Sequence, residues 1–419
     1  MSVVSRALGA GGVVLGVVGA AALGGITAQR AAMKKYRAVT LEAADQFDAL
    51  PVDRSYSVLA EDGALLHVEE TGPADAPLTV VFAHGWALRL GAWHFQRLGL
   101  AGPDFGATPG IAAAGIAAVK GVAEKSTAAK GLAEKSTASK SMASKSMASK
   151  SVAGKSAGGT SASRAPQVRM VFYDHRSHGL SGKSKIQHPT MTDLAADLAA
   201  VIATCAPTGP LVLVGHSMGG MALLALAGIN PGLFRDRVVG VGLLCTSVSE
   251  RPNPQIKREF LHSSNALVRV VAATAVRYPG LLERGRASTR DAVWLLTRAI
   301  GFARKDVSGA LVDYLDDMLT GTSIQVIADF VPAIVSHDQI ASLAHVVGIP
   351  VLVLAGDADR ITPAQQSVFI ANALPDAELV IVERAGHLAP LEAPEETNDA
   401  LRRLLHRSMD LAAIRTKSA

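Results

Sequence analysis

The segment that most constrains the fold of this chain is residues 215–219, which read Gly-His-Ser-Met-Gly. They follow the apolar run Leu211–Val214 and precede a helix-like stretch at 220–227. A buried strand, a G-x-S-x-G turn and a helix are typical of a nucleophile elbow. This is a sharp turn that strains its central residue and presents it at the carboxyl end of a sheet. The sequence therefore predicts that Ser217 is a nucleophile.

A serine hydroxyl needs a neighbouring base to take its proton. The histidines downstream of the elbow are His262, His337, His345, His387 and His406. Of these, His387 lies in a loop directly after the apolar run Leu379–Val382, where a rigid strand can position a catalytic side chain. His406 falls in a terminal helical pattern and is interpreted as a surface residue. We predict His387 as the base, and a solvated loop histidine is the alternative.

The acid that orients this base should follow the buried run Val351–Ala355. Two carboxylates compete there, Asp357 and Asp359. Asp359 lies further from the strand, just before the Thr-Pro pair at 362–363, and is the preferred candidate. Asp357 is then interpreted as a turn former whose side chain satisfies local backbone N–H groups.

An oxyanion formed by attack of Ser217 needs two fixed N–H donors. The backbone N–H of Met218, the residue after the nucleophile, is one candidate. The other should follow an early strand, and the run Leu78–Ala83 leads into His-Gly-Trp at 84–86. We predict the Trp86 N–H as the second donor. A simple strand-ending turn is the alternative for this tripeptide.

Two further segments extend the pattern. Residues 172–181, Phe-Tyr-Asp-His-Arg-Ser-His-Gly-Leu-Ser, resemble a D-x-R-G-x-G-x-S loop in which Ser177 replaces the first glycine. Residues 386–395 resemble a histidine loop and the start of a final helix. Together with the elbow, these segments make the chain similar to the α/β-hydrolase family from about Tyr56 to Arg403, apart from one insertion.

The resemblance implies an α/β fold with a mostly parallel eight-stranded sheet, flanking helices and a helical cap. It implies a catalytic triad of Ser217, Asp359 and His387, with Trp86 and Met218 in the oxyanion hole. Alternating strand-like and helical runs favour the same architecture. The predicted strands are 56–60 and 65–69 as an antiparallel lead-in, then 79–83, 168–173, 211–214, 238–245, 351–355 and 378–382. The clearest cap helices are predicted at 266–277, 292–303 and 307–319.

The chain divides into six parts by composition and pattern. They are an apolar segment with a basic flank at 1–37, a first part of the hydrolase core at 38–100 and 166–247, a low-complexity insertion at 101–165, a cap at 248–347, a second part of the core at 348–409, and a tail at 410–419.

The insertion contains a lysine at every fifth position from Lys120 to Lys155. Its eight lysines against Glu124 and Glu134 carry +6, more than the whole chain's +5, so the basic character does not belong to the predicted catalytic core. Without an apolar face the repeat cannot bury a core, and we expect disorder or a loose alanine-rich helix. Its functional interpretation is weak polyanion binding, and a tolerated repeat expansion is the alternative. Specific nucleic-acid binding is not expected.

The N-terminal region contains an uncharged stretch at 7–29, which is 23 residues and long enough to cross a bilayer. Basic residues crowd its downstream side at Arg30, Lys34, Lys35 and Arg37. This bias predicts membrane association with the catalytic domain in the cytoplasm. A secreted protein with a cleaved signal, or a soluble cytoplasmic protein, is the alternative.

No metal-ligand spacing and no cofactor-binding fingerprint stands out, so no metal or cofactor is expected. The two cysteines, Cys205 and Cys245, are interpreted as reduced core thiols. The leading hypothesis is a serine hydrolase that cleaves carboxylic esters, among them small-molecule or lipid esters. A cofactor-free haloperoxidase-like perhydrolase and a carbon–carbon bond hydrolase use the same triad and stay open. A non-catalytic binding protein on a hydrolase scaffold is the alternative from another class.

Overall fold

A computed structural model describes residues 47, 50, 52–101, 168–249, 298, 301–304 and 306–418. The uncharged stretch at 7–29, the lysine repeat at 120–155 and the cap helix predicted at 266–277 lie outside the described residues, as does most of the helix predicted at 292–303.

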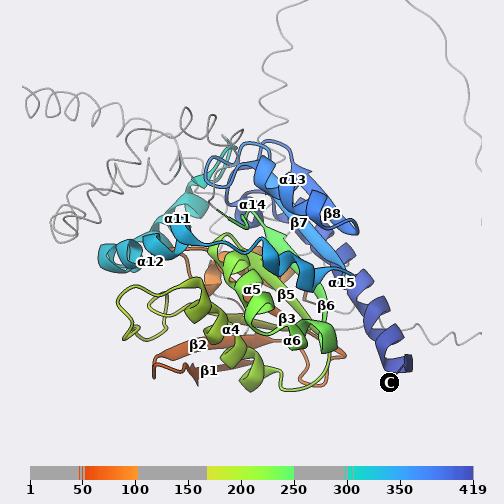
Figure 1. Cartoon of the computed structure of the whole chain (residues 1–419). Helices are drawn as coiled ribbons and strands as arrows, with labels where there is room; N and C mark the ends of the chain where they lie inside the picture. The colour runs from red at the N-terminus through yellow and green to blue at the C-terminus, as the bar shows by residue number, and fades with distance from the viewer. Residues whose placement is uncertain are drawn as a thin grey trace, which may run out of the picture.

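One eight-stranded sheet forms the centre of the described structure (Figure 1). Its strands are β1 (Arg54–Leu59), β2 (Leu65–Thr71), β3 (Leu78–Ala83), β4 (Val168–Tyr173), β5 (Leu211–His216), β6 (Val238–Leu244), β7 (Val351–Gly356) and β8 (Ala377–Val382). They lie in the order β1-β2-β4-β3-β5-β6-β7-β8. The β1–β2 and β2–β4 pairs are antiparallel, and all other neighbours are parallel. The predicted mostly parallel sheet with an antiparallel lead-in is confirmed.

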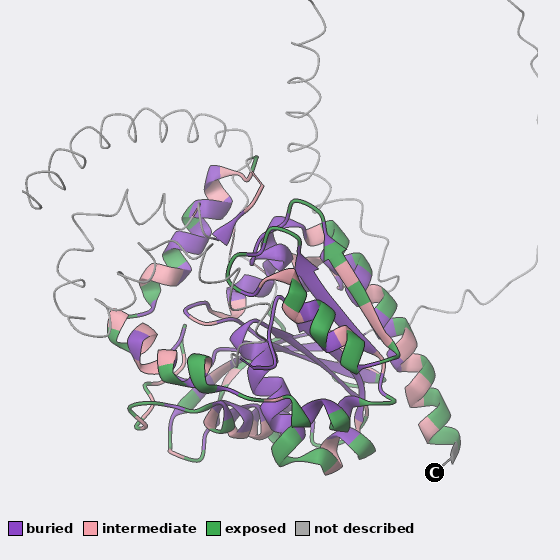
Figure 2. Ribbon diagram, turned by 45° about the horizontal axis from the view of Figure 1, so that its top comes forward, coloured by how far each residue is buried: buried purple, intermediate pink, exposed green. Residues whose placement is uncertain are grey.

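Helices cover both faces of this sheet. On one face lie α4 (Met191–Cys205), α5 (Met218–Ile229), α6 (Pro231–Asp236) and α13 (Ala364–Ala373), and on the other lie α2 (His94–Gly99) and α15 (Pro394–Ser418). Because central strands such as β3 and β5 bury side chains on both faces, they read as continuous apolar runs rather than alternating ones. Figure 2 shows this buried centre and the more exposed end of α15.

The described part of the cap consists of α11 (Gly309–Gly321) and α12 (Ile324–Ser336). The helix predicted at 307–319 corresponds to α11. Residues 341–346, predicted as the end of the cap, form the 3₁₀ helix η4 and pack against α5 of the core. Residues 410–418, predicted as a tail, continue α15. Two short elements, η2 (Leu90–Trp93) and α14 (Ala389–Glu392), border the candidate site.

Within the described ranges, no single helix is long and apolar enough to cross a bilayer. The successive helices α11 and α12 reach that length and composition only together, and they meet at a bend of 87°.

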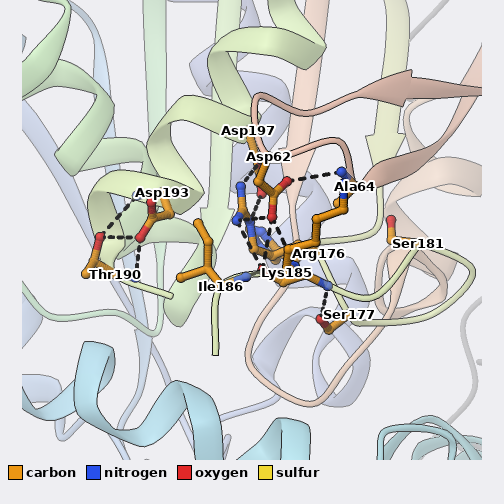
Figure 3. Close-up of polar contacts among 12 residues, drawn as sticks. Asp62, Ala64, Arg176, Ser177, Ser181, Lys185, Ile186, Thr190, Asp193 and Asp197 are labelled. Atoms are coloured by element: carbon orange, nitrogen blue, oxygen red, sulfur yellow. Dashed lines mark hydrogen bonds and ion pairs between the residues drawn. The ribbon is translucent and has the colours of Figure 1, made fainter. Parts of the chain in front are cut away.

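The loop after β4 is anchored by a buried arginine (Figure 3). Arg176 donates two hydrogen bonds of 2.6 Å to the carboxylate of Asp197 on α4 and a third of 3.1 Å to Asp62 in the β1–β2 turn. Ser177, which stands where the resembled motif has glycine, adopts a left-handed φ of 65°. Its hydroxyl accepts a hydrogen bond of 2.9 Å from the Ser184 N–H, so a polar contact supports the strained turn. This loop is thereby fixed to two other elements.

Candidate active site

The turn between β5 and α5 has the geometry that the G-x-S-x-G pattern predicts. Ser217 alone separates the two elements, with φ 52° and ψ −119°, a conformation that L-residues rarely adopt. Gly219 allows α5 to begin against the end of β3, because a Cβ there would lie 2.1 Å from the Ala83 carbonyl oxygen. The hydroxyl of Thr246 donates a hydrogen bond of 2.7 Å to the Ser217 carbonyl and supports the turn from the end of β6.

The structure brings Ser217, Asp359 and His387 together from three different strand ends. The His387 Nε2 lies 3.0 Å from the Ser217 Oγ, and its Nδ1 lies 2.9 Å from Asp359 Oδ2. All three residues are buried. With Nδ1–H donated to the carboxylate, Nε2 is left to accept the proton of the serine hydroxyl. This arrangement can support nucleophilic attack by Ser217.

Asp359 is held by the turn that follows β7. Its Oδ1 accepts the backbone N–H groups of Ile361 and Thr362 at 2.8 and 2.9 Å, and the Thr362 hydroxyl donates to Oδ2 at 2.8 Å. Burial by itself would raise the pKa of Asp359, but His387 and the two backbone N–H groups bring it below its ordinary value. The carboxylate is therefore ionised at neutral pH. Asp357, the other sequence candidate, is exposed.

The two predicted oxyanion donors lie on segments that touch each other. Met218 is the first residue of α5, and the close approach of Gly219 to the carbonyls of Ala83 and His84 places that helix start against the segment leading to Trp86. The next residue, Ala87, has a φ of 61°, so the backbone turns sharply after Trp86. The roles of the Met218 and Trp86 N–H groups stay predictions.

Buried histidines support these loops, and the sequence analysis did not assign them a role. The ring of His84 accepts the backbone N–H of His175 at 3.0 Å, and the His175 Nε2 lies 3.0 Å from the His84 carbonyl. His216 Nε2 donates to the carbonyl of His387 at 2.8 Å. The loops after β3, β4 and β8 are therefore held by side chains whose only sequence signal was their position at or just after a strand end.

Burial keeps these three rings and that of His178 neutral. It lowers the pKa of His175 to about 3, of His178 to about 4 and of His216 to about 3, and it holds the pKa of His84 well below its ordinary value. In an unfolded chain a histidine titrates near pH 6.5. Below that pH the unfolded state binds more protons than the native state, so the native state loses stability as pH falls.

We therefore expect the free energy of unfolding to be largest above about pH 6.5 and to decrease by about 2 kcal/mol per buried histidine at pH 5. Four groups oppose this trend: burial raises the pKa of Asp174 to about 6 and also raises the pKa of Asp197 and of Glu392, and the hydrogen bond to Glu69 raises the pKa of His67. Urea unfolding at pH 7, 6 and 5 measures the net slope. His178→Gln should reduce the slope of the free energy of unfolding against pH by about one proton. His406→Gln, at an exposed position, should leave this slope unchanged. A pH-independent stability would contradict the interpretation.

A cavity of about 390 Å³ lies beside the candidate site rather than in it. It opens between β2, the loop after β4, η2 and α11, and neither Ser217, Asp359 nor His387 lines it. Arg97 in its wall is buried, donates to Glu69 at 2.6 Å and stacks on the Phe172 ring. Arg97 and Glu69 therefore form an ion pair in the cavity wall. In the described ranges no group of three or more His, Cys, Asp or Glu residues could hold a metal ion.

The model of the Alpha/beta hydrolase family matches residues 150–400, more than half of the chain. The chain belongs to this family. The match begins after β3, yet β1–β3 belong to the same sheet as the matched strands in the structure. Residues 101–165 lie between β3 and β4 in the sequence, yet β3 pairs directly with β4 and β5 in the sheet.

Several known proteins are similar to this alpha/beta hydrolase. The "Putative carbamate hydrolase RutD" of Pseudomonas syringae pv. syringae is 26% identical over 242 residues, which cover 56% of this chain and 83% of that protein. A thermophilic esterase from Thermogutta terrifontis superposes with a TM-score of 0.54 at 21% identity, covering 85% of this chain and 99% of its own. A bromoperoxidase from Bacillus anthracis superposes with a TM-score of 0.55 at 16% identity, covering 84% of this chain and 100% of its own. The two structural similarities support the fold.

Proposed function

We propose that this alpha/beta hydrolase cleaves carboxylic esters through an acyl-enzyme on Ser217. The observation that carries the proposal is the continuous contact from Asp359 through His387 to Ser217, with 2.9 and 3.0 Å between the hydrogen-bonding atoms. A serine, a histidine and a buried carboxylate in this order activate the hydroxyl for attack on an acyl carbon.

In the acylation step, the Ser217 Oγ forms a bond to the acyl carbon while its proton passes to His387 Nε2. The ionised Asp359 stabilises the resulting imidazolium, and the backbone N–H groups of Met218 and Trp86 are proposed to donate to the oxyanion. One such donor is typically worth about 3 kcal/mol of the barrier. When the tetrahedral intermediate collapses, the carbon–oxygen bond of the ester breaks and His387 returns the proton to the departing alkoxide.

In the deacylation step, His387 takes a proton from water as the water oxygen attacks the acyl carbon. Collapse of the second intermediate releases the carboxylic acid and returns the proton to Ser217. The same groups therefore act twice, and no external cofactor enters this proposed sequence.

A carbamate is the second candidate substrate class, since the similar protein from Pseudomonas syringae bears the name carbamate hydrolase. Carbamates and esters share an acyl carbon that a serine can attack, and they differ in the nitrogen that conjugates with it. Perhydrolysis receives less support, because the bromoperoxidase similarity shows the fold alone at 16% identity. Membrane association through 7–29, which would favour lipid esters, remains a proposal about residues outside the described structure.

The test combines turnover with covalent labelling. Purified full-length protein is assayed on p-nitrophenyl esters from acetyl to palmitoyl and on a p-nitrophenyl N-methylcarbamate, and it is treated with a fluorophosphonate whose site is mapped by mass spectrometry. Ester turnover with the label on Ser217 supports the proposal, and faster carbamate than ester turnover would favour the second class. Folded protein that neither turns over these substrates nor accepts the label would contradict both.

A further inference from the structure

Glu392, at the end of α14, holds two chain segments with one buried carboxylate. Its side chain is 5% exposed. Its Oε2 accepts the backbone N–H of Gly386 at 2.5 Å, directly before His387, and its Oε1 accepts the backbone N–H of Arg304. Burial raises the pKa of Glu392, while the N–H groups of Arg304, Gly386 and Ala303 oppose that shift. The carboxylate thus joins the histidine loop to residues 301–304.

Residues 301–304, which we name the cap-return segment, lie within the predicted cap and precede α11. The segment packs directly on the histidine loop, because a Cβ on Gly386 would lie 3.0 Å from the Ala303 nitrogen and 3.1 Å from the Gly301 oxygen. On the other side of the site, Tyr314 of α11 donates to the Gly91 carbonyl at 2.9 Å, close to the loop that carries Trp86. The described part of the predicted cap therefore contacts the histidine loop and η2, which follows the loop that carries Trp86.

We propose that Glu392 is a positioning residue that couples the cap-return segment to the reach of His387 toward Ser217. This inference rests on the proposed function. The N–H that Glu392 holds belongs to Gly386, the residue directly before His387. On the other side of the imidazole, His216 holds the His387 carbonyl. A displacement of the cap-return segment is then passed through the carboxylate to the base. Because an error of about 1 Å at a reacting group can cost about 100-fold in rate, a small displacement is sufficient to switch off turnover.

The glutamine variant separates this role from general support. Glu392→Gln keeps the shape but replaces one acceptor oxygen by an amide donor, so the Gly386 or the Arg304 N–H loses its partner. We expect kcat for p-nitrophenyl acetate to fall by at least about tenfold while KM changes by less than about threefold. The matched control is Glu396→Gln in the first turn of α15, which removes an exposed carboxylate at 2.8 Å from the Arg304 side chain and should leave both constants unchanged.

A second variant separates bridging from charge. Glu392→Asp keeps the negative charge but is one methylene too short to reach both N–H groups, so it should behave as the glutamine variant does. Full recovery with aspartate would overturn the bridging role. Should the Glu392 variants fail to fold, Gly301→Ala crowds the contact between the cap-return segment and the histidine loop without altering the carboxylate, since its Cβ would lie 2.9 Å from the Leu388 side chain. It should lower kcat together with faster hydrogen exchange at Gly386 and Arg304, and an unchanged kcat would contradict the coupling.

Two readouts need no turnover, so they decide the inference even if the proposed function fails. Hydrogen exchange should accelerate together in the peptides containing Gly386 and Arg304 in Glu392→Gln, and in neither peptide in Glu396→Gln. The low-field proton resonance of His387 Nδ1–H, assigned by its loss in His387→Gln, should shift or broaden only in the Glu392 variants. Unchanged exchange and an unchanged resonance in Glu392→Gln would overturn the proposal, as would a uniform acceleration over the whole chain.

Discussion

Replacing Ser217 with alanine is expected to lower kcat for the best p-nitrophenyl ester by about 10⁴- to 10⁶-fold, because no other group can form the acyl-enzyme. The Ser217 Oγ lies 3.0 Å from His387 Nε2, and its strained backbone places it at the carboxyl end of β5. Alanine has to adopt the same strained backbone conformation in the elbow as serine does. The melting temperature of the variant should therefore remain within a few degrees of the wild type. Steady-state kinetics and circular dichroism measure the two quantities.

The matched control for this substitution is Ser367→Ala. Ser367 is buried on α13, and in the described part of the chain its hydroxyl oxygen has no hydrogen-bond partner. Its removal should change neither turnover nor fluorophosphonate labelling. If Ser217→Ala retained more than about 1% of wild-type turnover, another nucleophile or a direct attack by water would have to replace the acyl-enzyme proposal.

Exchanging Asp359 for asparagine is expected to lower kcat by about 10³- to 10⁴-fold. The carboxylate accepts Nδ1–H of His387 at 2.9 Å, whereas an asparagine amide that donates to Nδ1 would place the proton on Nε2 and leave no acceptor for Ser217. The two backbone N–H groups that hold Oδ1 can still bind the amide oxygen, so the fold of the turn should persist. Single-turnover kinetics with p-nitrophenyl acetate isolates the acylation step.

Asp357→Asn provides the comparison within the same turn. Asp357 is exposed and stands two residues closer to β7, so its substitution should change kcat by less than about twofold. A large loss in Asp357→Asn with little loss in Asp359→Asn would reverse the assignment of the acid. Equal small effects in both variants would mean that neither carboxylate orients His387.

The strand pattern of the core could be predicted because it is a local property of the chain. The apolar runs at Leu211–Val214 and Val351–Ala355 are β5 and β7 with small differences in their ends, since a strand buried on both faces needs consecutive apolar residues. The elbow was predictable because its glycines are close in sequence to Ser217: a Cβ on Gly215 would meet the backbone at the start of α5, and one on Gly219 would meet the Ala83 carbonyl of β3. Predictions about 7–29 and the lysine repeat concern residues outside the described structure.

The support of the site could not be predicted, because it depends on contacts between distant segments. Glu392 belongs to a recognisable pattern near the final helix, yet nothing in that pattern indicates that its carboxylate reaches back to Arg304 and Gly386. In the same way, the His216 ring and the Thr246 hydroxyl support the site by donating hydrogen bonds to carbonyls on other segments. Such hydrogen bonds leave no periodic signal in the sequence.

By itself, the sequence determined the type of sheet, the nucleophile elbow and the short set of residues from which a triad could be drawn, because turn chemistry and hydrophobic periodicity act over a few neighbouring residues. The tertiary structure decided that Asp359 rather than Asp357 lies beside His387, and that one buried carboxylate links the cap-return segment to the histidine loop. These outcomes depend on which strand ends lie side by side in the sheet, and that order follows from packing of the whole core.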